Sequence, residues 1–404
     1  MSAATVSRRT ELAQKARGFP VGSFRAIGLG ATAVGIVLLM LSAKGHADRV
    51  WSAYHFNFVF WLGLAQAGVV VAASQKLAKG HWSGLVIRFA EASVAFLPVA
   101  VVLFLVSYVG RAHIYPWVKE PRTDIGWWLS PTWFYLRDGA VLIAMTWLSW
   151  RFVRADVAPD VAELATGKPV DPTEAERGLI TRDAALVAIA FAFGLSLIAF
   201  DTIMSLAHRW VSNLYGAFYF MGSFLCALMW LAVVSIRMRQ RMELGDLYSR
   251  KQQHDLAKLC FGFTVFWAYL MFAQFLVIWY GNLPEETYFI FYRLWGPWRP
   301  VGVAVFLMVF LIPFIGLLGE KPKKSSAWLL GIAVLSIAGI WLERYYEIVP
   351  SVNGGAGPAL GVPELGAVLF FGGLYALSYS WFAGRYPMVS PRLAADTLER
   401  EHGH

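Results

Sequence analysis

Apolar runs of about 20 residues recur along the whole sequence, and no other feature restricts its possible folds as strongly. A helix needs about that length to cross the roughly 30 Å hydrocarbon core of a bilayer. Because the bilayer core offers backbone groups no water, such segments must be helices, and these runs are too long for barrel strands. A composition of 58% hydrophobic and 15% charged residues also excludes an ordinary soluble domain. The sequence therefore predicts an all-α, polytopic membrane protein.

Ten runs meet this description, so we predict ten transmembrane helices. Their approximate bounds are 24–43, 55–76, 85–110, 132–153, 183–207, 213–236, 256–280, 300–319, 327–348 and 363–384.

Lysine and arginine are divided unequally between the two sides that ten crossings define. Of the 35 such residues, 24 fall in the two tails and the loops on their side, 9 fall in the opposite loops, and Arg88 and Arg137 lie within helices. By the positive-inside rule, both termini are then cytoplasmic. The net charge of +9 is therefore a topology signal and not a nucleic-acid footprint.

Cysteine and histidine are placed where they would not hold a redox cofactor. Cys226 and Cys260 lie in or beside apolar helices, with no CxxC or CxxCH motif, which argues against an iron–sulfur cluster or covalent haem. The eight histidines lie in tails, loops or at helix ends, whereas a b-type haem needs facing histidines at membrane depth. We expect this chain to bind no metal and no redox cofactor of its own.

Two similar helix ends suggest an internal duplication. The stretches "FLVSYVG" at 104–110 and "FLVIWYG" at 275–281 each lead into a long outer loop that closes on a proline near a tryptophan. Four helices separate the copies, so both would have the same orientation, related by an axis along the membrane normal. Chance similarity between apolar helix ends is the alternative.

The duplication predicts the organisation of the chain, with two four-helix bundles and two peripheral helices. The predicted parts are a cytoplasmic N-terminal tail (1–23), a peripheral first helix with its outer loop (24–54), a first four-helix bundle (55–207), a second four-helix bundle (208–348), a peripheral tenth helix (349–384) and a cytoplasmic C-terminal tail (385–404).

The polar segment 155–182 is predicted to be a solvated cytoplasmic connection. Within it, Asp171, Pro172 and Glu174 resemble the start of a capped helix, so we expect a short surface helix there.

Three stretches resemble one known family. They are "HIYPWVKEP" at 113–121, "FDTIMSLAHRWVSNLYGAFYFMGSF" at 200–224 and "KLCFGFTVFWAYLMFAQFLVIWYGNLPEET" at 258–287. The sequence is similar along nearly its whole length to NrfD/PsrC-like membrane subunits, in particular the second such subunit of bacterial alternative complex III, a quinol:cytochrome c oxidoreductase.

The resemblance implies a cofactor-free subunit of the bacterial cytoplasmic (inner) membrane that supports quinol oxidation, with quinone or quinol as a possible ligand and proton translocation as a possible activity. It also implies several partners. These are a sister NrfD/PsrC-like quinol-oxidising subunit, multihaem and monohaem cytochrome c subunits, which carry haem c, a periplasmic iron–sulfur subunit with its clusters, a membrane-anchoring subunit, a terminal oxidase, and lipids.

Arg88 and Glu91 interrupt the third apolar run. Each charge near the middle of a membrane helix costs about 2.5–3.5 kcal/mol, and the i, i+3 spacing lets the two side chains pair on one helix face. In one interpretation Arg88 extends to the cytoplasmic interface and Glu91 neutralises it. In the other, Glu91 is a protonatable step in a cytoplasmic half-channel.

A second group of polar residues is predicted near the periplasmic helix ends, either as interfacial residues and caps or as a proton path or quinone site. Its members are His55, Arg137, Asp138, Asp201, His208, Gln274 and Glu343, which precedes Arg344.

Asp201 has apolar neighbours on both sides, so an interfacial role fits it poorly. A quinol hydroxyl needs a nearby base, and His208 could then pass a proton outward. Tyr215 and Tyr219 are candidates to line a ring-shaped pocket.

Three classes of function are compatible with the sequence. The first is a non-redox membrane subunit of a respiratory quinol oxidoreductase, and the others are a secondary transporter and a purely structural anchor. A transporter of this kind would have helices broken at matching positions of both halves, whereas Pro98 and Pro313 do not correspond. An anchor would not need Glu91 or Asp201.

The predicted topology can be tested with reporter fusions. Fusions near residues 115 and 245 should report opposite sides of the membrane, with residue 245 in the cytoplasm, because an odd number of crossings separates them. Two cytoplasmic signals would show that the helix count is wrong.

Overall fold

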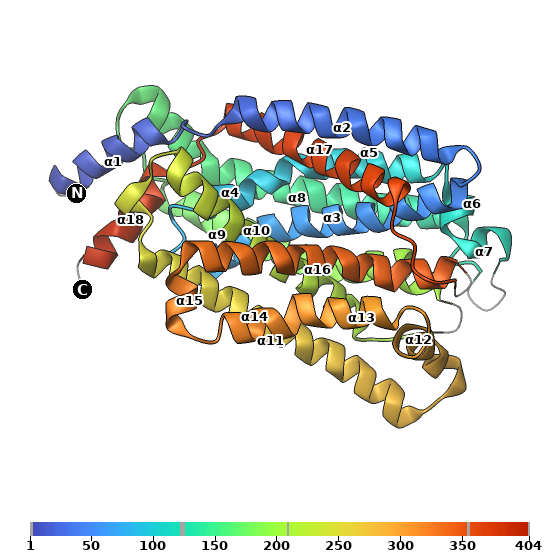
Figure 1. Cartoon of the computed structure of the whole chain (residues 1–404). Coiled ribbons are helices and arrows are strands. Elements are labelled where there is room, and N and C mark those ends of the chain that lie inside the picture. The colour runs from blue at the N-terminus through green and yellow to red at the C-terminus, as the bar shows by residue number, and fades with distance from the viewer. Residues whose placement is uncertain (1–2, 122–125, 208–209, 354–355, 403–404) are drawn as a thin grey trace.

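The computed structural model of this protein describes residues 3–121, 126–207, 210–353 and 356–402. Within these ranges all regular structure is helical and no strand occurs. Most of the long helices lie roughly parallel, and the first and last described helices lie at the same end of the bundle (Figure 1). We call this the terminal end.

Nine helical segments of the described chain are long and apolar enough to cross a membrane. They are α2 (Val21–Ala43), α3 (Ala47–Leu77), α4 to α5 (Ile87–Ser107), α9 with the turn η2 (Glu174–Leu206), α10 (Tyr215–Arg241), α11 (Arg250–Gly281), α13 to α14 (Arg299–Gly316), α16 (Ser326–Val352) and α17 (Val362–Arg385). Each coincides with a predicted span, and the prediction of an all-α polytopic membrane protein is confirmed.

The remaining predicted span, 132–153, is the first part of α8 (Pro131–Thr166). This helix has 36 residues, but Arg137, Asp138 and several aromatic residues lower its hydropathy, so composition alone does not select it. It packs against α9 and α5 within the bundle. A tenth crossing by α8 agrees with both chain ends lying at the terminal end (Figure 1).

Short helices close the two ends of the bundle. At the terminal end they are α1 (Ala3–Lys15), η3 (Gly245–Leu247), α15 (Glu320–Lys324) and α18 (Pro391–His402). At the opposite end they are α6 (Arg111–Ile114), α7 (Pro116–Lys119), η2 (Met204–Leu206) and α12 (Pro284–Leu294).

The helices α3 and α10 form the centre of the packing. They contact each other, α3 also contacts α9 and α5, and α10 also contacts α11 and α16. At the periphery, α2 lies along α17, where glycines allow close backbone approach: a Cβ at Gly35 would lie 2.4 Å from the backbone nitrogen of Phe370. The division into two bundles at residues 207 and 208 stays a prediction.

Two proline residues change the helices that contain them. Pro98 lacks a backbone N–H and crowds the carbonyl of the preceding turn, and the chain there forms the 3₁₀ turn η1 (Ala92–Phe96) between α4 (Ile87–Glu91) and α5 (Leu97–Ser107). Pro313 follows the π-helical turn η4 (Phe306–Leu311), between α13 (Arg299–Val305) and α14 (Ile312–Gly316). The first break places Glu91 at a helix junction.

The prediction of a solvated connection at 155–182 is wrong for much of its length. The helix α8 continues to Thr166, and its added turns bury Asp156 and Asp160, because these carboxylates bind buried cations. The expected short surface helix is also wrong. Thr173 and Glu176 form a capping box from which α9 (Glu174–Thr202) continues directly into the fifth span.

Candidate functional site

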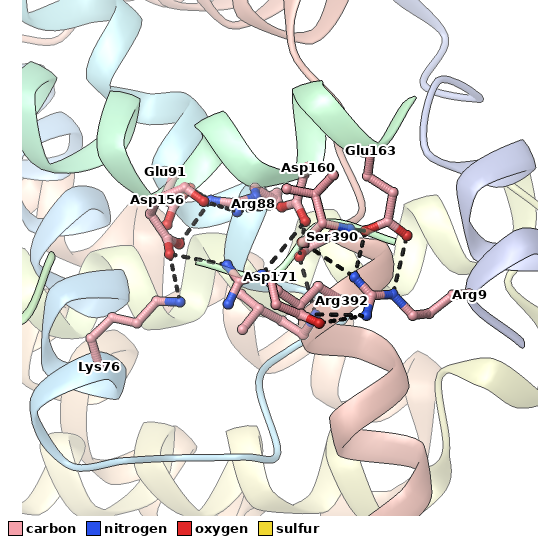
Figure 2. A network of polar contacts seen from close by, with 12 residues as sticks. Arg9, Lys76, Arg88, Glu91, Asp156, Asp160, Glu163, Asp171, Ser390 and Arg392 are labelled. Atoms are coloured by element: carbon pink, nitrogen blue, oxygen red, sulfur yellow. Dashed lines mark hydrogen bonds and ion pairs between the residues drawn. The ribbon is translucent and has the colours of Figure 1, made fainter. Parts of the chain in front are cut away.

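Three groups of buried polar residues lie in the bundle, and the first is at the terminal end (Figure 2). We call it the terminal network. Its members are Lys76, Arg88, Glu91, Asp156, Asp160 and Arg392.

Arg88 lies at the centre of the terminal network. One terminal nitrogen donates to Glu91 and, at 2.9 Å, to Asp156. The other donates to the backbone carbonyl of Asp156 at 2.8 Å and to Asp160 at 2.5 Å. The side chain has no exposed surface. The interpretation that Arg88 extends to the interface is therefore wrong, whereas its predicted pairing with Glu91 is present.

The carboxylates of the network have further cationic partners. The Lys76 ammonium lies 2.8 Å from Asp156, and the Arg392 guanidinium lies 3.5 Å from Asp156 and 4.0 Å from Asp160. With every group ionised, three cations face three anions. Glu91 alone contacts a single cation through one oxygen, and its Oε1 has no hydrogen-bond partner in the described part of the chain.

A second layer of contacts joins the chain ends to this region (Figure 2). Arg9 of α1 binds Glu163 at 2.5 Å and Asp171 at 3.3 Å, and Ser390 donates to Asp160 at 2.9 Å. The acidic partners raise the pKa of Arg9, although burial opposes them. Both chain ends are thus attached to carboxylates of α8 or of the segment that follows it.

The spacing of the acidic residues in the segment 155–182 predicts that some of them share a helix face, although the polar composition of the segment suggests a solvated loop. Asp156, Asp160 and Glu163 are spaced i, i+4 and i+7, which places them on one face of a helix. Because the segment is polar overall, it was expected to be solvated. The helical spacing of its acidic residues was the informative feature.

The second group of buried polar residues lies at the opposite end of the bundle, where α8 begins and α9 ends. Arg137 binds Asp201 at 2.5 Å and Asp138 at 3.3 Å, and its guanidinium lies 3.8 Å from the ring centre of Trp128. The Trp128 indole donates to Asp201 at 2.8 Å. Asp201 is therefore paired through both oxygens.

His55 lies beside this second group. Its Nε2 is 2.7 Å from the backbone carbonyl of Thr202, and its ring contacts Tyr115. Three residues predicted from the sequence are thus in direct contact: Arg137 binds both Asp138 and Asp201. His55 binds the carbonyl of Thr202, the residue that follows Asp201. The candidate His208 lies outside the described residues.

The third group surrounds a cavity of about 430 Å³ among α10, α11, α12, α13 and α16. Most lining side chains are aromatic or aliphatic. The polar or hydrogen-bonding members are Trp210, Tyr215, Trp267, Gln274, Arg293, Glu343, Tyr346 and Glu347. Gln274 and Glu343 were predicted site residues, and Tyr215 was a predicted pocket residue. Tyr219 lies outside the lining and donates to the carbonyl of Val59 at 2.8 Å.

Several contacts fix the walls of the cavity. The Trp267 indole donates to Glu343 at 2.8 Å, and Arg344 binds Glu347 at 2.6 Å. The Trp210 and Phe289 rings are stacked with centroids 3.7 Å apart.

Arg293 holds the short helix α12 onto α16. It donates to the backbone carbonyl of Glu347 at 2.7 Å and to Ser351 at 3.0 Å. Burial lowers the pKa of Arg293 to about 10, so the guanidinium is still charged at neutral pH.

Four polar atoms of the lining residues have no hydrogen-bond partner in the described part of the chain. They are Trp210 Nε1, Tyr215 Oη, Arg293 Nε and Glu343 Oε2, the last of which forms an ion pair with Arg344 at 3.4 Å. Native interiors pair most such groups, so four of them around one cavity suit a site that binds a polar ligand. Within the described residues, no three histidine, cysteine, aspartate or glutamate side chains are arranged to hold a metal.

The fold and these buried groups define the class of the molecule: a multi-pass helical membrane protein with ionisable clusters at both ends of its bundle. A family model described as polysulphide reductase, NrfD, matches residues 42–353, and the chain belongs to this family. NrfD-family proteins are membrane subunits of redox complexes and associate with redox subunits such as iron–sulfur and cytochrome proteins. A search of curated proteins finds no match to the chain.

The terminal network should be a major source of stability. Asp156→Ala leaves Arg88 and Lys76 short of an anionic partner, and breaking a buried ion pair costs about 3–5 kcal/mol. We expect a large fall in thermal stability or in the yield of assembled protein, measured by size-exclusion chromatography against temperature.

The matched control is Glu320→Gln, which breaks the exposed Glu320–Lys324 pair and should leave the thermal stability nearly unchanged. Equal effects of the two substitutions would show that the buried network does not stabilise the fold.

Proposed function

We propose that this chain is the ActF-type subunit of an alternative complex III, and that its cavity binds the ring of a quinone or quinol. The observation that carries the proposal is the set of four polar atoms without partners around a largely aromatic cavity. The quinone-linked role of the subunit rests on its family and on the resemblance of its aromatic stretches to that subunit.

The free atoms suit the functional groups of a quinone. A quinone presents two carbonyl oxygens, which accept hydrogen bonds, and Trp210, Tyr215 and Arg293 offer three N–H or O–H donors. A quinol presents hydroxyl groups, which can donate to Glu343 Oε2. The lining residues would therefore provide donors for the quinone and an acceptor for the quinol.

The shape of the site suits a ligand that arrives from the bilayer. The helix α11 contacts α14 and α15 near the terminal end and diverges from α13 and α16 toward the opposite end (Figure 1). The cavity is lined by residues of α11 and α13 in this region, including Gln274 and Val303. Phe306, another lining residue, begins the π-helical turn, a feature common at functional sites.

The residues around the cavity would orient the ring and receive a proton. Glu343 is held by Trp267 through one oxygen, and its other oxygen, which lies 3.4 Å from the Arg344 guanidinium, would accept a quinol hydroxyl proton. Electrons leaving the quinol would pass to haem c or iron–sulfur clusters of the partner subunits, because we propose that this chain carries no redox group.

The proposal includes the surroundings of the subunit. The complex would lie in the bacterial cytoplasmic membrane with the terminal end facing the cytoplasm, as the lysine and arginine distribution indicates. The partners are those implied by the resemblance: the sister quinol-oxidising subunit, the cytochromes c, the iron–sulfur subunit and the membrane-anchoring subunit.

Two tyrosines provide a matched test of the cavity. Tyr215→Phe removes a hydroxyl that has no partner, so the fold should keep its stability while quinone affinity falls about three- to tenfold. Tyr219→Phe removes a hydroxyl bonded to Val59, so stability should fall while quinone affinity is unchanged. The measurement is photolabelling of the purified complex with an azido-quinone, followed by mapping of the labelled peptides.

Label confined to the sister subunit, or equal loss of labelling in the two variants, would refute the cavity as the site. Mapping the label matters because the sister subunit is itself expected to bind quinol.

A second candidate function, proton conduction, is favoured by one specific observation. Glu91 is fully buried at a helix break, and its Oε1 has no hydrogen-bond partner in the described residues. A carboxylate that is not saturated by partners can gain or lose a proton more readily than Asp156, which contacts three cations.

Glu91→Gln tests this candidate because the amide keeps the shape of the side chain and removes its titration. We expect the complex to assemble with its full set of subunits and to translocate fewer protons per electron in liposomes. Unchanged proton translocation would exclude Glu91 as a carrier, and a failure of assembly would assign it to the structural network.

The other classes of function receive less support. The helix breaks at Pro98 and Pro313 fall in the third and eighth spans, which are not equivalent in a four-helix repeat, so they do not favour a transporter. A purely structural anchor would not require the free polar atoms of the cavity.

A further inference from the structure

The C-terminal segment of the chain enters the terminal end of the bundle instead of lying on its surface. Met388, Val389 and Ser390 are fully buried, and the Met388 N–H donates to the carbonyl of Ala16 at 2.8 Å. The helix α18 then packs against α1. The segment is therefore an integrated part of the fold.

The position of α18 depends on a close contact with Gly84. A Cβ at Gly84 would lie 2.1 Å from the carbonyl oxygen of Leu393, which is far inside van der Waals contact. Thr397 also donates to the carbonyl of His81. A residue with a side chain at position 84 would therefore push α18 away from the loop that contains Gly84.

The segment contributes two polar groups to the terminal network. Ser390 binds Asp160 at 2.9 Å, and Arg392 lies 3.5 Å from Asp156 (Figure 2). Of the charged groups in the network, Lys76 and Arg392 keep some exposure, at 16% and 15%, whereas Arg88 and Glu91 have none. The segment thus contributes one of the two partly exposed members of the network and contacts both carboxylates of α8 that bind Arg88.

Arg392 also completes the charge balance of the network. The charged groups that face one another there are Lys76 of α3, Arg88 and Glu91 of α4, Asp156 and Asp160 of α8, and Arg392 of α18. When Arg392 leaves, two cations face three anions. Asp160 then keeps Arg88 alone of its ionic partners, as Glu91 does, whereas Asp156 keeps Lys76 and Arg88.

We propose that the C-terminal segment, residues 386–402, is a stopper that controls access to Glu91: when seated, it keeps water away from Glu91, and when released, it admits water to it. The shielding is argued from burial and contacts alone. Its consequence for proton translocation rests on the proposed function, in which Glu91 carries protons.

Two changes that release the stopper by different means test the proposal in the intact complex. Gly84→Ala forces α18 away from its seat without altering any charge, and Arg392→Gln removes the ion pair while keeping the segment. The control is Arg400→Gln, which removes another cation of α18 and breaks only the exposed Arg400–Asp396 pair within that helix.

The measurement is modification by a water-soluble carbodiimide, which reacts with accessible protonated carboxyl groups, quantified by mass spectrometry of the peptide containing Glu91. We expect about tenfold faster modification in Gly84→Ala and Arg392→Gln, and the parental rate in Arg400→Gln. Assembly is checked by subunit content, and truncation after Arg385 is the replacement if Gly84→Ala does not assemble.

Modification of Glu91 at the parental rate in the released variants would overturn the proposal, and so would an equal increase in Arg400→Gln. The outcome is separable from proton translocation. If modification rises while Glu91→Gln leaves proton translocation intact, the stopper stands and the proton-carrier function fails.

Discussion

A guanidinium buried among apolar helices is the constraint on which the terminal half of this structure depends. Arg88 has no access to water, and an unpaired buried charge would cost more than a marginally stable fold can bear. Its partners come from α4 and from turns of α8 beyond the membrane-spanning part. The length of α8, the burial of an acidic segment and the seating of the C-terminal segment all follow from satisfying this one charge.

Two groups of polar residues at the end opposite the termini differ in their surroundings. Where α8 begins and α9 ends, Arg137, Trp128 and Asp201 bind one another directly. Where α11 diverges from its neighbours, Glu343 binds Trp267 and Arg344 beside a cavity, and the Tyr215 hydroxyl has no hydrogen-bond partner in the described residues. The second arrangement leaves space for a ligand.

Hydropathy and charge distribution were sufficient to predict the fold class and the helices, because the bilayer imposes length and polarity on each span separately. The partners of Arg88 do not follow from composition, because Asp156 and Asp160 lie in a polar segment and only their helical spacing places them on one face. The cavity could be predicted only in part. Glu343 and Gln274 are visible as polar residues in apolar runs, but Arg293 lies in a short connecting helix, and only tertiary packing brings these residues together.

The free atoms of the cavity carry an energetic argument of their own. Leaving a buried polar group without a hydrogen bond costs about 1–3 kcal/mol, so four such atoms are a substantial burden for one region of a fold. The terminal network also keeps atoms without a hydrogen-bond partner in the described residues, such as Glu91 Oε1, although Arg88 alone makes four hydrogen bonds there. An apolar cavity wall would have been more stable than one lined by Tyr215 and Glu343. A bound quinone ring that formed the missing hydrogen bonds would offset this cost, because the hydrogen-bond energy absent from the unliganded fold would be gained on binding.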